Sequence, residues 1–230
     1  MATASAPAPA PAPVSIRRAR SIQAKHIFFL CYGVLAVIAV YHQDLPLLRP
    51  GSAARQHLAP VTAFILPHGV FGALALVLAV FQFSTRLRQR YLWLHRLLGR
   101  VYVGSVFIAA PAAIPVSVIL GPPMLLMATI TQSAGWLLTT AIALYCVRQG
   151  NIQQHRQWMM RSYPFAMVFI FARATFAIPE IQRLGEIGVV SVVWTYVALA
   201  GFLPSVILNW RAIFPPKGVA RSIAKSQSAA

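Results

Sequence analysis

The sequence contains very few acidic residues and few charged residues of any kind. Only three of its 230 residues are Asp or Glu, and charged residues make up 10% of the chain. A soluble domain carries about 25% charged residues, so this composition argues against a soluble protein. Two cysteines are too few for a disulfide scaffold. Hydrophobic residues make up 58% of the chain and the mean hydropathy is +0.68, which indicates a membrane protein.

Six apolar runs follow one another along the chain. They lie at residues 25–42, 62–83, 101–120, 124–147, 163–178 and 188–210. A helix needs about 20 apolar residues to cross a bilayer, and continuous runs favour helices over the alternating strands of a barrel. The first and fifth runs are short, and the third can extend back through residues 91–100. The sequence therefore predicts an all-α integral membrane bundle of six transmembrane helices.

The basic residues predict how this bundle is oriented. Sixteen of the twenty lie in the N-terminal stretch, the second and fourth connections and the C-terminal stretch; three lie in the other connections, and Arg173 lies inside a run. Because Lys and Arg concentrate on the cytoplasmic side, both termini are predicted to be cytoplasmic. The same distribution explains the net charge of +17. The predicted partner is therefore the lipid bilayer of the cell membrane (the inner membrane in a bacterium), and not nucleic acid.

The domain organisation follows from composition and from the short connections. Residues 1–13 are almost entirely Ala and Pro, a composition that cannot bury a core. We predict a disordered, basic Ala/Pro-rich tail at residues 1–24 and one transmembrane domain at residues 25–212. A short basic cytoplasmic tail at residues 213–230 completes the chain. No connection is long enough for a further domain.

Two similar basic segments stand directly before apolar runs. The first is HRLLGRVY, from His95 to Tyr102, and the second is HRQWMMRSY, from His155 to Tyr163. Arginines beside a membrane helix anchor it at the anionic cytoplasmic leaflet, but anchoring does not explain a histidine at the start of both copies. Whether the fifth helix runs through Pro164 or begins near Ser162 is left open by the sequence.

Paired histidines at one depth suit a membrane haem b, which takes an axial histidine from each of two helices and basic partners for its propionates. The candidate haem-binding residues are His95, His155, His68, Arg96, Arg100 and Arg156. A second haem could pair His68 with His42. One hypothesis is therefore a redox protein that exchanges electrons with a quinone. No carboxylate or thiolate lies near either histidine group, so no other metal site is predicted.

A second polar layer is expected nearer the opposite ends of the helices. His68, Gln132 and Arg173 lie at comparable depth when the helices are laid out at their usual rise. Ionisable side chains inside membrane helices almost always face the bundle interior. A histidine that is hydrogen-bonded to a neighbouring helix, or an arginine that reaches the membrane interface, would be explained without any ligand. The other hypothesis is a small-molecule or lipid-binding carrier or assembly partner, in which these residues bind a small anionic ligand.

The motifs also carry a resemblance to a known family. The matching features are the stretch His68–Leu76, the pair Gln82-Phe83, the two histidine motifs and Arg173. Together they resemble a family of predicted bacterial multi-pass membrane proteins that is described only as a domain of unknown function. The resemblance covers roughly residues 62–180, and Ala79 and Val80 stand where the family usually has a glycine. It implies a bundle of six to seven membrane helices and leaves open whether the chain is an enzyme.

Overall fold

The computed structural model describes residues 16–49 and 51–214, and every regular element in this part of the chain is a helix. The predicted all-α fold is therefore confirmed. The long helices are α1 (Ile16–Ala39), α4 (Thr62–Gln82), α6 (Leu92–Leu120), α7 (Pro123–Arg148), α8 (Ile152–Phe176) and α10 (Gly185–Ile213). The short elements are the π-helical η1 (Val40–Asp44), α2 (Leu45–Leu48), α3 (Ala53–His57), the 3-10 helix η2 (Ala59–Val61), α5 (Thr85–Arg90) and α9 (Pro179–Gln182).

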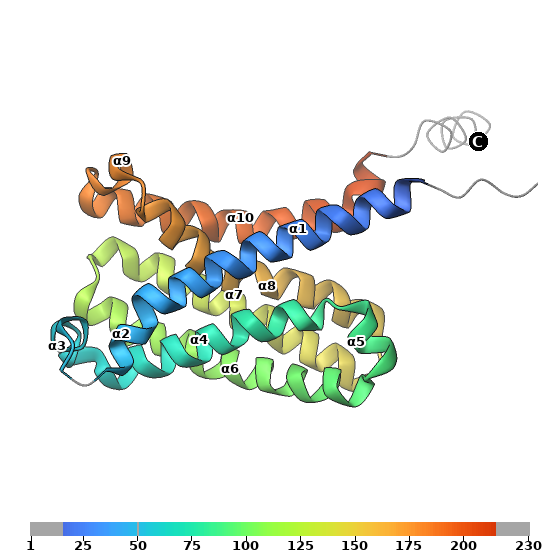
Figure 1. The fold of residues 1–230 in the computed structure, drawn as a ribbon, viewed down its shortest axis with the longest axis horizontal. Helices are drawn as coiled ribbons and strands as arrows, with labels where there is room; N and C mark the ends of the chain where they lie inside the picture. Colours follow the sequence, from blue (N-terminus) through green and yellow to red (C-terminus); the bar gives the residue numbers. More distant parts are fainter. Residues whose placement is uncertain (1–15, 50, 215–230) are drawn as a thin grey trace, which may run out of the picture.

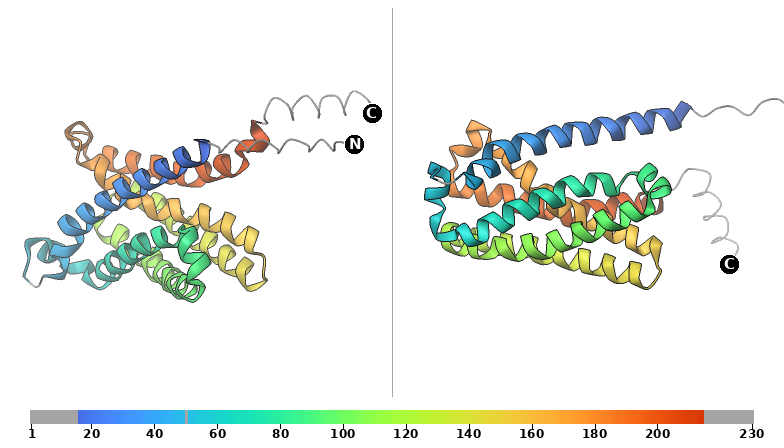
Figure 2. Two further views of the ribbon diagram at one scale, coloured as in Figure 1. Left: turned by 45° about the vertical axis from the view of Figure 1, so that its right-hand side comes forward. Right: turned by 60° about the horizontal axis from the view of Figure 1, so that its bottom comes forward.

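The long helices alternate in direction along the chain (Figure 1). One end of the bundle holds the start of α1, the short helix α5, the turn between α7 and α8, and the end of α10 (Figures 1 and 2). We call this end the α5 end. The opposite end holds α2, α3, the turn between α6 and α7, and α9, and we call it the α9 end. Connections that join neighbouring antiparallel helices are short, as the sequence predicted.

Four helical stretches in the described part of the chain are long and apolar enough to cross a membrane. They are Ala59–Gln82, Leu92–Leu120, Pro123–Arg148 and Gly185–Trp210. A shorter apolar stretch, Ile27–His42, covers the second half of α1 and the start of η1. Length and composition thus support four of the six predicted crossings. The crossings by α1 and α8 remain predictions.

Helix α8 is the central helix of the bundle, because it packs against α1, α4, α7 and α10. Its buried residues are Ser162, Tyr163, Phe165, Ala166, Met167, Val168, Ile170 and Ala172. The polar residues that distinguish α8 from α4, α6 and α10 lie mainly before Ser162, in the half of the helix that is not buried.

The outer surface of the bundle is strongly apolar. Large side chains on several helices are well exposed, among them Phe107, Val118, Leu138 and Phe202. A soluble monomer rarely exposes a continuous apolar surface of this extent. The exposed surface is therefore suited to contact with lipid.

Several boundaries differ from the sequence-based expectation or resolve it. Helix α1 begins at Ile16, inside the stretch predicted as a tail, and residues 1–15 and 215–230 lie outside the described residues. Helix α6 begins at Leu92, which confirms the backward extension of the third run. Helix α8 begins at Ile152 and continues through Pro164, so the second histidine motif is helical throughout.

Candidate functional site

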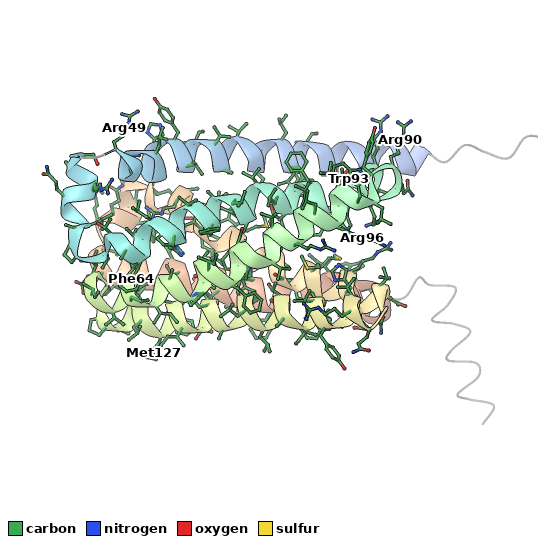
Figure 3. All side chains as sticks on the ribbon, turned by 90° about the horizontal axis from the view of Figure 1, so that it is seen from below. Arg49, Phe64, Arg90, Trp93, Arg96 and Met127 are labelled. Carbon is green, nitrogen blue, oxygen red and sulfur yellow. The ribbon has the colours of Figure 1, made fainter. Side chains whose placement is uncertain are left out.

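A cavity of 1120 Å³ lies at the α5 end, among α4, α5, α6, α7 and α8. Its basic lining residues are Arg88, His95, Arg96, Arg100, Arg148, His155 and Arg156. None of the side chains that line it is acidic. We call it the basic cavity, and Figure 3 shows that Arg96 lies at the same end of the bundle as Arg90 and Trp93. A concentration of cations without a carboxylate favours an anionic ligand.

Three polar atoms in this lining are buried and have no hydrogen-bond partner within the described part of the chain. They are Gln82 Nε2, His95 Nδ1 and the Tyr163 hydroxyl oxygen. The Gln82 side chain reaches α6 one turn beyond His95, because its Oε1 lies 3.6 Å from where a Cβ on Gly99 would stand. Buried polar atoms in folded proteins nearly always have a partner, so these atoms are suited to binding a polar ligand.

His155 is held in one orientation by α7. Its Nδ1 lies 2.9 Å from the carbonyl oxygen of Ala143. Because a carbonyl oxygen only accepts, Nδ1 must carry the proton, and Nε2 of the neutral ring is left as an acceptor or a metal ligand. The start of α8 is fixed as well, since the Asn151 side chain accepts a hydrogen bond of 3.1 Å from the Gln154 backbone N–H.

The arginines around the basic cavity are close enough to repel one another. Partial burial, and then the neighbouring charge of Arg156, lower the pKa of Arg88. A bound anion would offset this repulsion. Arg161 belongs elsewhere: it does not line the cavity, and its guanidinium carbon lies 5.0 Å from the ring centroid of Trp158 on the same helix.

A second cavity, of 520 Å³, lies nearer the α9 end, among α4, α6, α7, α8 and α10. His68, Gln132 and Arg173 all line it, so the structure brings together the three residues of the predicted second polar layer. We call it the His68 cavity. His68 Nδ1 lies 2.9 Å from the carbonyl oxygen of Ala109, and Gln132 Nε2 donates to the carbonyl oxygen of Phe165 at 3.1 Å. Both side chains are thus anchored to a neighbouring helix.

A closed hydrogen-bonded ring lies between the two cavities. The Trp136 indole N–H donates to the Tyr102 hydroxyl at 3.2 Å, which lies 3.0 Å from the Ser162 hydroxyl. Ser162 lies 2.7 Å from the Thr140 hydroxyl, which donates to the Trp136 carbonyl at 2.7 Å. Trp136 lines the His68 cavity, and Tyr163, which follows Ser162, lines the basic cavity. The ring therefore lies between the two cavities along α7 and α8.

The structure groups most, but not all, of the predicted site residues as expected. His95, His155, Arg96, Arg100 and Arg156 line the basic cavity. His68 lies in the other cavity, so the three candidate haem-binding histidines are not brought together. His42 is exposed beside Tyr41 and is absent from the lining of the His68 cavity.

Two of the basic-cavity arginines were missed by the sequence reasoning. Arg88 lies on α5 and Arg148 ends α7. Their position beside apolar runs could have signalled them, but the direction in which each side chain points depends on tertiary packing. The ring of hydrogen bonds through Tyr102 was not predicted either, because hydroxyl side chains in helices most often bond to the backbone of their own helix.

Comparison with known proteins identifies one family. A family model described as "Predicted membrane protein (DUF2306)" matches residues 65–213, a range that contains both cavities' histidines and arginines. No curated protein and no solved structure matches this chain.

Proposed function

Because this chain belongs to the DUF2306 family of predicted membrane proteins, we propose that its six long helices all cross the bilayer. We also propose that the basic cavity binds an amphipathic anion at the cytoplasmic side. The observation that carries the proposal is the lining of this cavity. It combines five arginines and two histidines with no acidic side chain. It also contains three buried polar atoms that have no hydrogen-bond partner among the described residues.

The alternating directions of the long helices support six crossings. If α4, α6, α7 and α10 cross the membrane, α8 must also cross it, since it joins the end of α7 at the α5 end to α9 at the other end. Among the described residues, thirteen of the basic residues belong to the segments that meet at the α5 end, and three to those at the α9 end. The positive-inside rule then puts the α5 end, and both termini, in the cytoplasm.

Cysteine labelling tests this topology at α8, the helix whose composition is least typical of a membrane span. Cys31 and Cys146 are free and would first be replaced by serine. Single cysteines at the exposed positions Gln149 and Arg183 then mark the two ends of α8. An impermeant maleimide is expected to label Gln149→Cys only in inverted vesicles and Arg183→Cys only in right-side-out vesicles. Labelling of both from the same side would contradict the proposal.

An anionic lipid headgroup is the simplest ligand for the basic cavity. Basic pockets between membrane helices on the cytoplasmic side bind such headgroups. Arginine suits phosphate and carboxylate oxygens because its N–H groups can bind two of them at once. The unpartnered Gln82 Nε2 offers a further donor deeper in the lining. The apolar lining residues, such as Val103 and Met159, would contact an acyl chain.

Haem b is a second candidate, and the orientation of His155 favours it. A metal-binding histidine usually donates its other ring N–H to a carbonyl or carboxylate, as His155 does to Ala143. His95 and His155 come from different helices, lie close enough to interact electrostatically and line the same cavity. The arginines would balance the propionates, and bound haem would supply one-electron chemistry.

The experiment for the basic cavity compares two double variants that lose the same net charge. Arg100→Gln/Arg156→Gln changes two lining residues, and Arg86→Gln/Arg90→Gln changes two exposed arginines that do not line the cavity. Each charge near an anionic leaflet contributes about 1 kcal/mol to general lipid attraction, and this term is the same in both variants. Binding of phosphatidylglycerol, measured by native mass spectrometry, is expected to be about tenfold weaker in the lining variant than in the control.

Equal weakening in the two variants would contradict a cavity site and indicate leaflet anchoring only. The absorption spectrum of the same wild-type preparation tests the haem candidate. If haem b is bound, a Soret band is expected, and it should disappear in His155→Ala and persist in His42→Ala, which changes an exposed histidine outside the cavity. A colourless preparation from haem-sufficient cells would eliminate the haem candidate.

A further inference from the structure

The basic cavity has an exposed part and a buried part with different chemistry. Four of the arginines that line it are exposed, namely Arg96, Arg100, Arg148 and Arg156. Three polar atoms of the same lining are buried and have no hydrogen-bond partner among the described residues, and they belong to Gln82, His95 and Tyr163. A ligand that reaches both parts would therefore carry an anionic group and also uncharged polar groups.

The three buried side chains meet where α4, α6 and α8 come together. Gln82 approaches α6, because its Oε1 lies 3.6 Å from where a Cβ on Gly99 would stand, one turn after His95. The ring centroid of Phe83, the residue next to Gln82, lies 5.2 Å from the ring centroid of Tyr163 on α8. Tyr163 is seven residues beyond Arg156, which places it about 10 Å further along the helix. The buried group therefore lies on the inner side of the exposed arginines.

Each of the three buried atoms can donate a hydrogen bond. Gln82 Nε2 can only donate, His95 Nδ1 donates in one tautomer of the neutral ring, and the Tyr163 hydroxyl donates through its single proton. A buried donor without an acceptor is costly to the protein. A ligand that offers acceptors only would match all three atoms. Carbonyl oxygens have this property, and each can accept two hydrogen bonds.

On the basis of the anion site proposed above, we propose that the anion in the basic cavity is an ester-linked lipid whose ester carbonyl oxygens accept hydrogen bonds from Gln82 and His95. In a diacyl phospholipid the two ester groups lie between the phosphate and the acyl chains. The phosphate then binds the exposed arginines, and the two carbonyl oxygens offer enough lone pairs for the three buried donors. The acyl chains continue along apolar lining residues such as Val103.

The test compares two lipids that differ only in these carbonyl groups. Dipalmitoylphosphatidylglycerol and its dihexadecyl ether analogue share the headgroup, the charge and the chain length. Ether oxygens are weaker acceptors than ester carbonyls, so the full-length protein is expected to bind the ether lipid about tenfold more weakly. Native mass spectrometry of the detergent-solubilised protein measures both affinities.

Gln82→Met removes one buried donor, keeps the length of the side chain and leaves the net charge unchanged. It should weaken binding of the ester lipid about fivefold and leave binding of the ether lipid unchanged. Gln89→Met is the matched control, because Gln89 is an exposed glutamine of α5 that does not line the cavity. If Gln82→Met does not fold, His95→Leu has the same expected effect, since it removes another buried donor.

The anion site and the ester contact can fail separately. Arg100→Gln/Arg156→Gln should weaken binding of both lipids by the same factor, and a loss of this weakening would contradict the anion site. Equal binding of the ester and ether lipids by the wild type would overturn the ester contact alone. Equal weakening of both lipids by Gln82→Met would overturn it too, since the amide would then support the shape of the cavity and not bind the ester.

Discussion

Replacing Tyr102 with phenylalanine is expected to lower the free energy of unfolding by about 1–2 kcal/mol, although the substitution removes a single oxygen atom. Tyr102 is completely buried, and its hydroxyl joins the Trp136 indole N–H to the Ser162 hydroxyl. Without it, the Trp136 N–H loses its partner in a place that water does not reach, and Ser162 keeps only its hydrogen bond to Thr140. The effect should appear as a lower midpoint in denaturant titrations of the detergent-solubilised protein.

The ring of hydrogen bonds has one consistent direction, which sharpens this prediction. Thr140 donates to the Trp136 carbonyl, so Ser162 must donate to Thr140 and Tyr102 to Ser162. Each hydroxyl therefore donates once and accepts once. Single interhelical hydrogen bonds in membrane proteins average only about 0.6 kcal/mol, so a loss above 1 kcal/mol would mean that the ring acts as a unit.

A control and a double variant separate this effect from others. Tyr145→Phe removes the same atom from an exposed side chain of α7 and should leave stability unchanged. Combining Tyr102→Phe with Ser162→Ala should cost less than the sum of the two single changes, because both break the same ring. Additive losses, or a Tyr102→Phe protein as stable as the Tyr145→Phe protein, would contradict the argument.

The sequence predicted the helices best where the helix and the apolar run coincide. The run at residues 62–83 corresponds to α4, which spans Thr62–Gln82. The prediction was poorest for α8, where the run at residues 163–178 covers only its second half. The first half is polar and still helical, because Asn151 caps it and α7 packs against it. Hydropathy cannot detect this first half, because it lies at the α5 end and lines the basic cavity and has no buried residue.

The sequence predicted the depth of the candidate site residues in the bundle, but not the directions in which their side chains point. Placing residues at the usual helical rise correctly grouped His95 with His155, and His68 with Gln132 and Arg173. Depth alone could not show that His68 and His155 each form a hydrogen bond with a carbonyl oxygen of the neighbouring helix, because that depends on how the helices are rotated against one another. For the same reason the Trp136–Tyr102 contact, which joins α7 to α6, has no signature in the sequence.

The hydrogen-bonded ring also bears on how the two cavities relate. A carrier that moves one ligand across the membrane needs a path between its two sides, and the ring, whose hydroxyls are all engaged within the protein, lies between the cavities. We therefore expect two independent cavities and not one translocation path. On this view, Tyr102→Phe should destabilise the protein without changing which lipids the basic cavity binds.

Gly135 is the position where the smallest addition should have a large effect. A Cβ on Gly135 would lie 2.6 Å from Cζ and 2.7 Å from Cε1 of the Phe165 ring, well inside van der Waals contact. Phe165 is buried, so its ring must shift against packed neighbours. Overpacking of this kind costs about 1–3 kcal/mol, while replacing a helical glycine gains about 0.5–1 kcal/mol. Gly135→Ala is therefore expected to be destabilised by about 1–2 kcal/mol in the same denaturant titration.

Gly104→Ala provides a control with the opposite expected sign. Gly104 is an exposed helical glycine of α6, and a Cβ there would meet nothing within 4 Å, so only the gain of about 0.5–1 kcal/mol remains. Adding Phe165→Leu to Gly135→Ala should recover part of the loss, because leucine lacks the ring atoms that collide. If Gly135→Ala were as stable as Gly104→Ala, α7 and α8 could not approach as closely at this point as the contact with Phe165 requires.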